Sequence, residues 1–439
     1  MQKNDNLQAL LNHLRQEPAG SKTLAAKLGC DRSTVSRLIA QCQDRIISTG
    51  RARATLYYLC RHTDNSETSL YCITETGNAR HFARMIAVMP HGYLVKRNSD
   101  EDFIYYDDLP WWLQDMRPQG FLGRALAKHL YHNKIVSSAD PDSWSDNDVF
   151  NALRLSQHDA PGNLLVGEQS YQQWLLHTPT VITVDDFAML AEQAISGEIP
   201  GSSAGGEQPK FCVVVNDRHL LVKFSAATRN ANSQRWADLL QAECLALNIL
   251  QQHQIAAGPC EIITDQHRTY LSYQRFDRIG LSGRRGVVSL RMAEMEFVGH
   301  PAEWPVIAHR LYQQQLISEH DYHTIAVIWC YGRLLANTDM HTGNLSFFYE
   351  GGHNLQLAPV YDMLPMAFAP DRSGAMTSSY PLNISPVADA VFWKQAYPLA
   401  HQFWQQLSQH PAISAEFRQI AGNMLQQFPA AQAMINRMA

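Results

Sequence analysis

Apolar residues in the first sixty positions recur with the period of amphipathic helices. Leu7, Leu10, Leu11 and Leu14 stand at i, i+3, i+4 and i+7, which predicts a helix with one buried face. Two shorter helices are expected on either side of Gly29, because glycine readily takes the left-handed conformation that ends a helix. Two helices joined by a short turn with glycine are typical of a helix-turn-helix unit.

The second helix of this pair presents a small polar and basic outer surface. Its outward positions are Arg32, Ser33, Ser36 and Arg37. A hairpin is expected next, with Arg51 and Arg53 at its tip. Residues 5–60 therefore resemble a winged helix-turn-helix domain, in which basic side chains bind phosphates and Ser or Thr side chains position the helix or read bases. A small helical packing module with solvated charges is the alternative.

Charge separates this module from the rest of the chain. Residues 1–60 contain nine Lys and Arg against four Asp and Glu, a net charge of +5, whereas the whole chain carries −5. A basic module on an acidic body favours contact between that module and a polyanion. We therefore expect double-stranded DNA as a partner.

Residues 61–185 carry no spacing of polar side chains that indicates chemistry. Short apolar alternation from Tyr71 to Arg97 predicts strands joined by turns, and Trp111 and Trp112 are expected to anchor a core. We interpret this stretch as a structural subdomain or a docking surface for a partner.

A loop of small residues, PGSSAGGEQPK, leads into two predicted strands. Gly205 and Gly206 would let backbone N–H groups approach an anion closely. Lys223 lies in the second strand, within the apolar run LLVKF, where a lysine is expected to have a charged partner. Glu243 is the candidate, since it falls on the apolar face of the helix predicted over 234–250. Such a pair is typical of phosphate positioning in protein kinases.

The segment TYLSYQRFDRIG predicts a strand that leaves through Gln274 and Phe276. It follows the lysine strand and the glutamate helix, so we expect it to be the hinge between two lobes, where adenine lies in kinases. An additional edge strand is the alternative.

The stretch ANTDMHTGNLSFF places an aspartate and an asparagine at the spacing of a kinase catalytic loop, with Asp339 five residues before Asn344. A second predicted strand returns to Asp362, where kinases have another metal-binding carboxylate. Because Mg²⁺ takes oxygen ligands, we predict that Asn344 and Asp362 hold it. Asp339 would orient the substrate hydroxyl and accept its proton. The alternative is that these residues only cap a turn.

Bulk composition is that of a cytosolic protein with two or three domains. The chain has 439 residues, is 45% apolar and 18% charged, and contains no run apolar enough to span a bilayer. Its first residues lack the pattern of a signal peptide, and its eight cysteines include no C-x-x-C pair. We therefore expect reduced thiols, a cytoplasmic location and no membrane partner.

Three stretches resemble the HipA-like serine/threonine kinases. SSAGGEQPKF resembles their glycine-rich loop, QRFDR their hinge and LAPVYDML their metal-aspartate strand. The D-x-H-x-x-N loop also resembles that of choline and aminoglycoside kinases, but the three stretches favour the HipA-like family. LPWWLQDMRPQGFLGR resembles the amino-terminal subdomain of that family. The resemblance covers about residues 70–439, and it identifies a HipA-like variant with a fused helix-turn-helix.

This resemblance implies a bilobal α/β (α+β) protein-kinase-like fold of the HipA type, preceded by a winged helix-turn-helix domain. The expected domains are the helix-turn-helix over 1–60, a HipA amino-terminal-like subdomain over 61–185, a small lobe over 186–280 and a helical large lobe over 281–439.

Roles follow for the matching residues. Asp339 matches the catalytic base, Asn344 and Asp362 match the metal ligands, and Lys223 matches the phosphate-binding lysine. Ser202 or Ser203 matches the serine whose autophosphorylation expels the glycine-rich loop and silences the kinase. The loop is one residue longer than the common form, so both serines remain candidates. Gln274 and Phe276 match positions that hold adenine, although the family often has glutamate where Gln274 stands.

The implied activity is ATP- and Mg²⁺-dependent phosphorylation of a protein serine or threonine, in a toxin-like enzyme. Known family targets include aminoacyl-tRNA synthetases, which makes such a protein a candidate substrate. HipA proteins usually rely on a separate DNA-binding antitoxin, whereas here a DNA-binding module is attached. Helix-turn-helix modules often work as dimers, so a homodimer is also considered. The alternatives are an ATP-sensing transcription regulator with an inactive kinase domain and a small-molecule phosphotransferase of the choline or aminoglycoside type.

Overall fold

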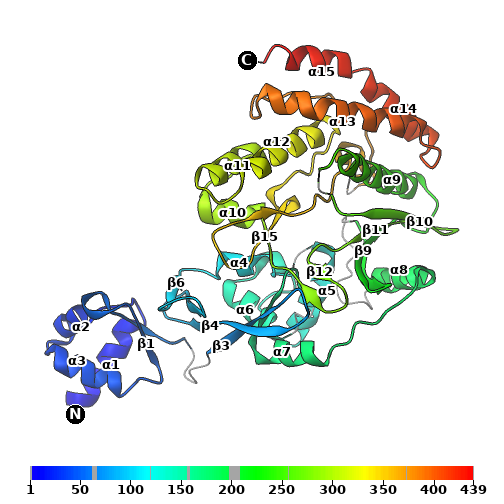
Figure 1. The fold of residues 1–439 in the computed structure, drawn as a ribbon. Helices are drawn as coiled ribbons and strands as arrows, with labels where there is room; N and C mark the ends of the chain where they lie inside the picture. Colours follow the sequence, from blue (N-terminus) through cyan, green and yellow to red (C-terminus); the bar gives the residue numbers. More distant parts are fainter. Residues whose placement is uncertain are drawn as a thin grey trace.

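A computed structural model describes the protein over residues 2–61, 67–118, 120–155, 159–196, 208–255, 257–371 and 373–438. Figure 1 shows the amino-terminal helices at one end of the molecule, the carboxyl-terminal helices at the other, and mixed sheets and helices between them.

The amino-terminal unit is a three-helix packing closed by a two-stranded hairpin. It comprises α1 (Gln2–Leu14), α2 (Ser21–Leu28), α3 (Arg32–Ala40), β1 (Ile46–Thr49) and β2 (Leu56–Leu59). The leucines of α1 that were expected to face inward belong to its core together with apolar residues of the other two helices. The unit therefore has a small apolar core of its own.

Two local signals fix the turn between α2 and α3. Gly29 has φ +60° and ends α2, because glycine takes this left-handed conformation without a steric cost. Asp31 caps α3, since its side chain accepts a hydrogen bond of 2.7 Å from the Thr34 N–H.

The middle of the chain begins with an antiparallel five-stranded sheet in the order β6-β5-β4-β3-β7. Its strands are β3 (Thr68–Ile73), β4 (Ala79–Ala87), β5 (Tyr93–Arg97), β6 (Ile104–Tyr106) and β7 (Leu164–Val166). The expected strands between Tyr71 and Arg97 are therefore present. Around this sheet lie α4 (Trp111–Gln114), α5 (Gly120–His132), α6 (Asp146–Leu155) and α7 (Gly167–Leu176).

A four-stranded antiparallel sheet follows, in the order β10-β11-β9-β8. Its strands are β8 (Lys210–Val215), β9 (Arg218–Phe224), β10 (Cys260–Thr264) and β11 (Thr269–Gln274). Helix α8 (Phe187–Ser196) packs on one face through an aromatic cluster, and the long helix α9 (Ala231–Gln252) packs on the other. Asn216 and Asp217 both have positive φ, which suits the tight turn between β8 and β9.

The carboxyl-terminal part is mainly helical. Short strands form a pair, β12 (Arg278–Ile279) with β13 (Gly283–Arg284), and a three-stranded sheet of β14 (Val287–Ser289), β15 (Ser346–Phe348) and β16 (Gln356–Leu357). The helices are α10 (Leu290–Phe297), α11 (Trp304–Gln313), α12 (Glu319–Leu334), α13 (Ala390–Gln409), α14 (Ala415–Leu425) and α15 (Phe428–Ile435).

One apolar core extends from the middle sheet through α9 into the carboxyl-terminal helices. Fully buried tryptophans at 304, 329, 393 and 404 fill its helical end. Among the described helices, none has the length and apolar character needed to cross a bilayer.

Candidate functional site

Lys223 is the centre of a buried group of charges. It lies on β9 and is only 5% exposed. Its Nζ lies 2.8 and 3.0 Å from the two carboxylate oxygens of Glu243 on α9 and also contacts Oδ1 of Asp362. The expected Lys223–Glu243 pair is present, and the structure adds a carboxylate that is 139 positions away in sequence.

Neighbouring charges decide the protonation states of Lys223 and Asp362. Burial opposes the ammonium of Lys223, but Asp362 and Glu243 outweigh it and raise the pKa of the lysine well above its usual value. Burial likewise opposes the carboxylate of Asp362, yet Lys223 and Lys210 hold the pKa of Asp362 below its usual value. The lysine is therefore charged, and Asp362 is an anion at neutral pH.

Contacts in the first half of helix α9, before Glu243, fix the helix that carries this residue. A capping box at Asn230 and Ser233 starts the helix, with Asn230 Oδ1 accepting from the Ser233 N–H at 2.8 Å. Further along, buried Arg235 contacts Glu416 of α14 at 2.7 Å, and Asp238 accepts from Ser414. Because Glu243 is 0% exposed, its position follows that of the helix.

A buried asparagine, Asn337, positions the polar residues of the loop after α12. Asn337 is 2% exposed; its Nδ2 donates to the backbone oxygen of Asp362 at 3.2 Å, and its Oδ1 accepts from the Asp339 N–H at 3.0 Å. Asn344 donates to the backbone oxygen of Asp339 at 2.8 Å. The structure therefore brings together Asp339, Asn344 and Asp362, as the sequence predicted.

Two side chains shape the turn between Asp339 and Asn344. His341 Nδ1 accepts from the Gly343 N–H at 3.0 Å and caps the short 3-10 helix Thr342–Asn344. The Tyr361 hydroxyl donates to the Gly343 oxygen at 2.9 Å, so the turn is tied to the residue before Asp362. Asp362 itself has φ +52°, a conformation that costs energy for a residue with a side chain and is typical of functional sites.

The surroundings of Asp339 raise the pKa of its carboxyl group, so that it keeps its proton up to a higher pH than usual. Burial and the nearby Asp362 raise its pKa, although His341, Lys223 and Lys210 act in the opposite direction. Lys210 was not singled out from the sequence. It stands opposite Lys223 in the β8–β9 register, so both lysines contribute positive charge to this group.

The oxygen atoms of Asn344 and Asp362 fit the chemistry of Mg²⁺. The Asn344 hydrogen bond described above uses its nitrogen, which leaves the amide oxygen able to act as a ligand. Within the described ranges, no group of three or more His, Cys, Asp or Glu side chains is placed to hold a metal ion. Mg²⁺ usually takes only one or two protein groups beside phosphate oxygens, so a pair of oxygen donors is a fitting set.

The two predicted hinge residues point to different places. Phe276 packs against Phe348 and Tyr361, with ring centroids 5.8 Å apart in both contacts, and so reaches the residue next to Asp362. Leu271 of β11 stands opposite Lys223, so these two side chains share one face of the sheet. Side chains alternate along a strand, so Gln274, like Ser272, lies on the other face. Its side chain lines a cavity of about 310 Å³ with Val184. The Gln274 side chain therefore lies on the face of β11 away from Lys223, and its backbone N–H donates to the Pro259 oxygen at 3.3 Å.

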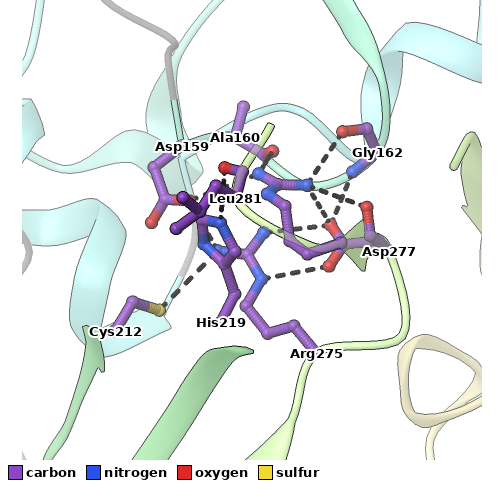
Figure 2. Close-up of polar contacts among 9 residues, drawn as sticks. Asp159, Ala160, Gly162, Cys212, His219, Arg275, Asp277 and Leu281 are labelled. Carbon is purple, nitrogen blue, oxygen red and sulfur yellow. Dashed lines mark hydrogen bonds and ion pairs between the residues drawn. The ribbon is translucent and has the colours of Figure 1, made fainter. Parts of the chain in front are cut away.

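The charged residues of the QRFDR motif form an anchor that the sequence did not indicate. Figure 2 shows Arg275 and Asp277 joined to the segment that carries Asp159 and Gly162. Arg275 makes a two-point contact with Asp277 at 3.0 and 2.9 Å and reaches Asp159 at 2.7 Å. Arg278 binds Asp277 at 2.7 Å, and Gly162 donates its N–H to Asp277 at 2.9 Å. The hinge is thereby fixed to the loop between α6 and β7.

Four predicted residues of the glycine-rich loop lie outside the described residues, namely Ser202, Ser203, Gly205 and Gly206. The segment that follows is described: the Gln208 side chain donates to the backbone oxygen of Phe224, next to Lys223.

The six predicted DNA-binding residues are all exposed. In α3, the Ser33 hydroxyl donates to Asp31 at 2.6 Å and Arg37 donates to Thr34 at 2.9 Å. Arg51 at the hairpin forms an exposed ion pair of 3.2 Å with Glu101 from the middle of the chain. The α3 surface is therefore open, whereas the hairpin arginine shares its charge with an acidic neighbour.

Comparisons with known proteins give two matches to family models. Residues 64–175 match the YjjJ-like toxin middle domain, and residues 202–432 match the HipA-like C-terminal domain. The chain is also 40% identical to Toxin YjjJ of Escherichia coli (strain K12), over 98% of this chain and 99% of that protein. The chain belongs to the HipA-like family.

A solved structure shows the same fold at low identity. HipA of Shewanella oneidensis MR-1, in a complex with HipB and its operator DNA, matches with a TM-score of 0.53 and 14% identity. The match covers 83% of this chain and 96% of that one. The HipA-like family membership and the mixed α/β, kinase-like fold expected from the sequence are thus confirmed.

Proposed function

We propose that this HipA-like protein is an ATP- and Mg²⁺-dependent kinase that phosphorylates serine or threonine in a protein, in a toxin-like role, and that its amino-terminal unit binds DNA. The observation that carries the kinase proposal is the buried contact of Lys223 with both Glu243 and Asp362. Two carboxylates from distant segments meet one lysine next to a loop with Asp339 and Asn344, which is the set of groups that phosphoryl transfer requires.

Each side chain has a distinct task in this proposal. Lys223, held by Glu243, binds phosphate oxygens, and Phe276 and the Gln274 backbone border the adenine. Asn344 and Asp362 hold Mg²⁺, which when bound neutralises charge on the phosphates. Asp339 orients the substrate hydroxyl and accepts its proton; the raised pKa of Asp339 makes it a better proton acceptor.

The glycine-rich loop completes the proposal. Gly205 and Gly206 cover the phosphates with backbone N–H groups. Ser202 or Ser203 receives a phosphate from the same active site, which would switch the kinase off as the family resemblance implies. The protein substrate is external to the chain, and an aminoacyl-tRNA synthetase is a fitting candidate.

The DNA-binding part rests on the open surface of α3. Arg32 and Arg37 are exposed on this helix beside Ser33 and Ser36, and the unit carries a net positive charge. Arg53 and Arg51 extend the surface along the hairpin tip, where Arg51 would exchange Glu101 for a phosphate. The similar structure of HipA from Shewanella oneidensis contains HipB and operator DNA, which supports a DNA partner for this chain as well.

The decisive experiment is phosphate incorporation into the purified full-length chain with Mg-ATP, followed by intact mass and mapping of the phosphopeptide. We expect one phosphate on Ser202 or Ser203, and none in the Asp339→Asn variant. ATP binding without phosphate in either protein would refute the kinase and favour the ATP-sensing regulator. Turnover on amino-alcohols or aminoglycosides, without any protein phosphorylation, would favour the small-molecule phosphotransferase.

A further inference from the structure

Two cysteine sulfurs are in contact beside the helix that carries Glu243. Cys244 is the next residue on α9, and Cys260 is the first residue of β10. Their Sγ atoms lie 3.1 Å apart, closer than two sulfurs that merely pack side by side. The structure describes both residues as free thiols.

Neighbouring polar groups orient the two thiols. Asn248, one turn after Cys244, donates its Nδ2 to the Cys244 sulfur at 3.6 Å. The Cys260 thiol lies 3.7 Å from Asn248 Oδ1 and 3.6 Å from the Cys244 backbone oxygen. Both sulfurs therefore have polar neighbours, and they also pack against the apolar cluster of Leu240, Leu271 and Tyr273 between α9 and the sheet.

A cavity gives small molecules access to this pair. It has a volume of about 290 Å³. It is lined by Gln241, Cys244, Leu245, Asn248, Cys260, Glu261, Ile262 and His410. Hydrogen peroxide is scarcely larger than water, which needs only about 30 Å³, so an oxidant of this size fits easily.

The two thiols differ in reactivity. Hydrogen bonding from Cys260 lowers the pKa of Cys244, whereas the same contact and burial raise the pKa of Cys260. Cys244 is therefore the thiol that ionises more readily, and the Cys260 sulfur lies 3.1 Å from it.

We propose that Cys244 and Cys260 form an oxidisable dithiol site whose disulfide links α9 to β10. The Cys244 thiolate attacks one oxygen of hydrogen peroxide, taking up a proton, and gives a sulfenic acid and one water. The Cys260 thiol then attacks the Cys244 sulfur, forms the S–S bond and releases a second water. The two thiols lose two hydrogens and two electrons, which the peroxide takes up.

This disulfide is expected to act on the nucleotide site, a consequence that rests on the proposed kinase function. An S–S bond is about 2.05 Å long, so the sulfurs must approach by about 1 Å. That movement is applied one residue from Glu243, whose carboxylate holds Lys223. Tyr273, the register partner of Cys260, also contacts Glu243 at 3.5 Å. A shift of this size in a positioning group is worth up to about 100-fold in rate.

The test treats the full-length protein with hydrogen peroxide, alkylates the remaining thiols and maps disulfides by peptide mass. We expect a Cys244–Cys260 peptide in the wild type, reversed by dithiothreitol. In Cys260→Ser, Cys244 should instead accumulate as a sulfenic acid that dimedone traps. Cys30→Ser, in the amino-terminal unit, is the matched control and should still form the disulfide.

Two results would overturn the site: full alkylation of both cysteines after peroxide, or disulfides that involve other cysteines instead. Phosphate incorporation is measured on the same samples and should fall at least about 10-fold on oxidation and return on reduction, but only when both cysteines are present. A mapped disulfide with unchanged phosphoryl transfer would overturn the coupling to Glu243. If the reduced protein has no kinase activity, the proposed function fails, and the peptide map alone decides the dithiol site.

Discussion

Replacing Asp277 by asparagine tests whether the buried arginine cluster holds the hinge to the middle of the chain. The side chain of Asp277 is 7% exposed and accepts from Arg275, Arg278 and the Gly162 N–H. Asparagine keeps the shape but removes the charge, so both arginines lose their main buried partner. Among the described residues, the half-exposed carboxylate of Asp159 is then the remaining anionic partner of both arginines, while Arg278 keeps the backbone oxygens of Ala160 and Gly162.

The expected magnitude follows from the burial. Removing one partner of a buried ion pair costs about 3–5 kcal/mol, because the other charge is left uncompensated. Since Asp159 stays in place, we expect about 3 kcal/mol, the lower end of that range. Glu101→Gln is the matched control, because Glu101 and its partner Arg51 are 85% and 80% exposed. An exposed pair of this kind contributes about 0–1 kcal/mol.

The assay is urea unfolding of both variants, followed by fluorescence and by circular dichroism, with free energies compared only where the two signals coincide. A loss below about 1 kcal/mol in Asp277→Asn, no larger than that in Glu101→Gln, would refute the reasoning.

The pH dependence of stability tests the same contacts between Asp277 and the two arginines. Burial opposes the Asp277 carboxylate, but Arg275 and Arg278 outweigh it and hold the pKa of Asp277 below 3.8. The stabilisation is therefore complete above pH 3.8 and lost as the pH falls through the lower folded pKa. The difference between wild type and Asp277→Asn should stay constant from pH 8 to 5 and shrink only below about pH 4. A difference that already declines between pH 7 and 5 would contradict this assignment.

Three further substitutions test the proposed site and the DNA-binding surface. Lys223→Met should reduce phosphate incorporation by at least about 100-fold, measured by intact mass on protein shown to be folded; activity near wild type would exclude the lysine from phosphate binding. Asn337→Ala should lower kcat about 10- to 100-fold with little change in KM for ATP, because it loosens Asp339 and Asp362 together. Steady-state kinetics measures both constants, and an unchanged kcat would show that Asn337 does not position these residues. Arg37→Ala should weaken DNA binding, and the slope of log Kd against the logarithm of the salt concentration should fall by about one, the contribution of one phosphate contact. Fluorescence anisotropy at several salt concentrations measures both. Equal binding and slope would place Arg37 outside the interface.

The parts of the site that the sequence predicts are those with local or spacing signals. Lys223 stands out because an apolar strand rarely carries a lysine without a partner, and Glu243 because it lies on the apolar face of the next helix. Asp339 and Asn344 are found by a fixed spacing within one turn. In each case the information lies within a few tens of residues.

The missed features depend on contacts between distant segments. Asp159 is 116 positions from Arg275, and no pattern near either residue announces their pairing. Asn337 reads as an ordinary turn residue until the structure shows it between Asp339 and the Asp362 backbone. Gln274 was predicted from a linear match, which carries no information about the face of β11 on which it lies.

The attachment of α9 to α14 sets an order of events during synthesis. Arg235 and Asp238 are both buried, and their partners Glu416 and Ser414 belong to the last thirty residues of the chain. Until those residues leave the ribosome, the helix that carries Glu243 has a buried cation and a buried anion without these partners. A nascent chain therefore lacks part of the support for its lysine site until Ser414 and Glu416 have been made and have docked on α9.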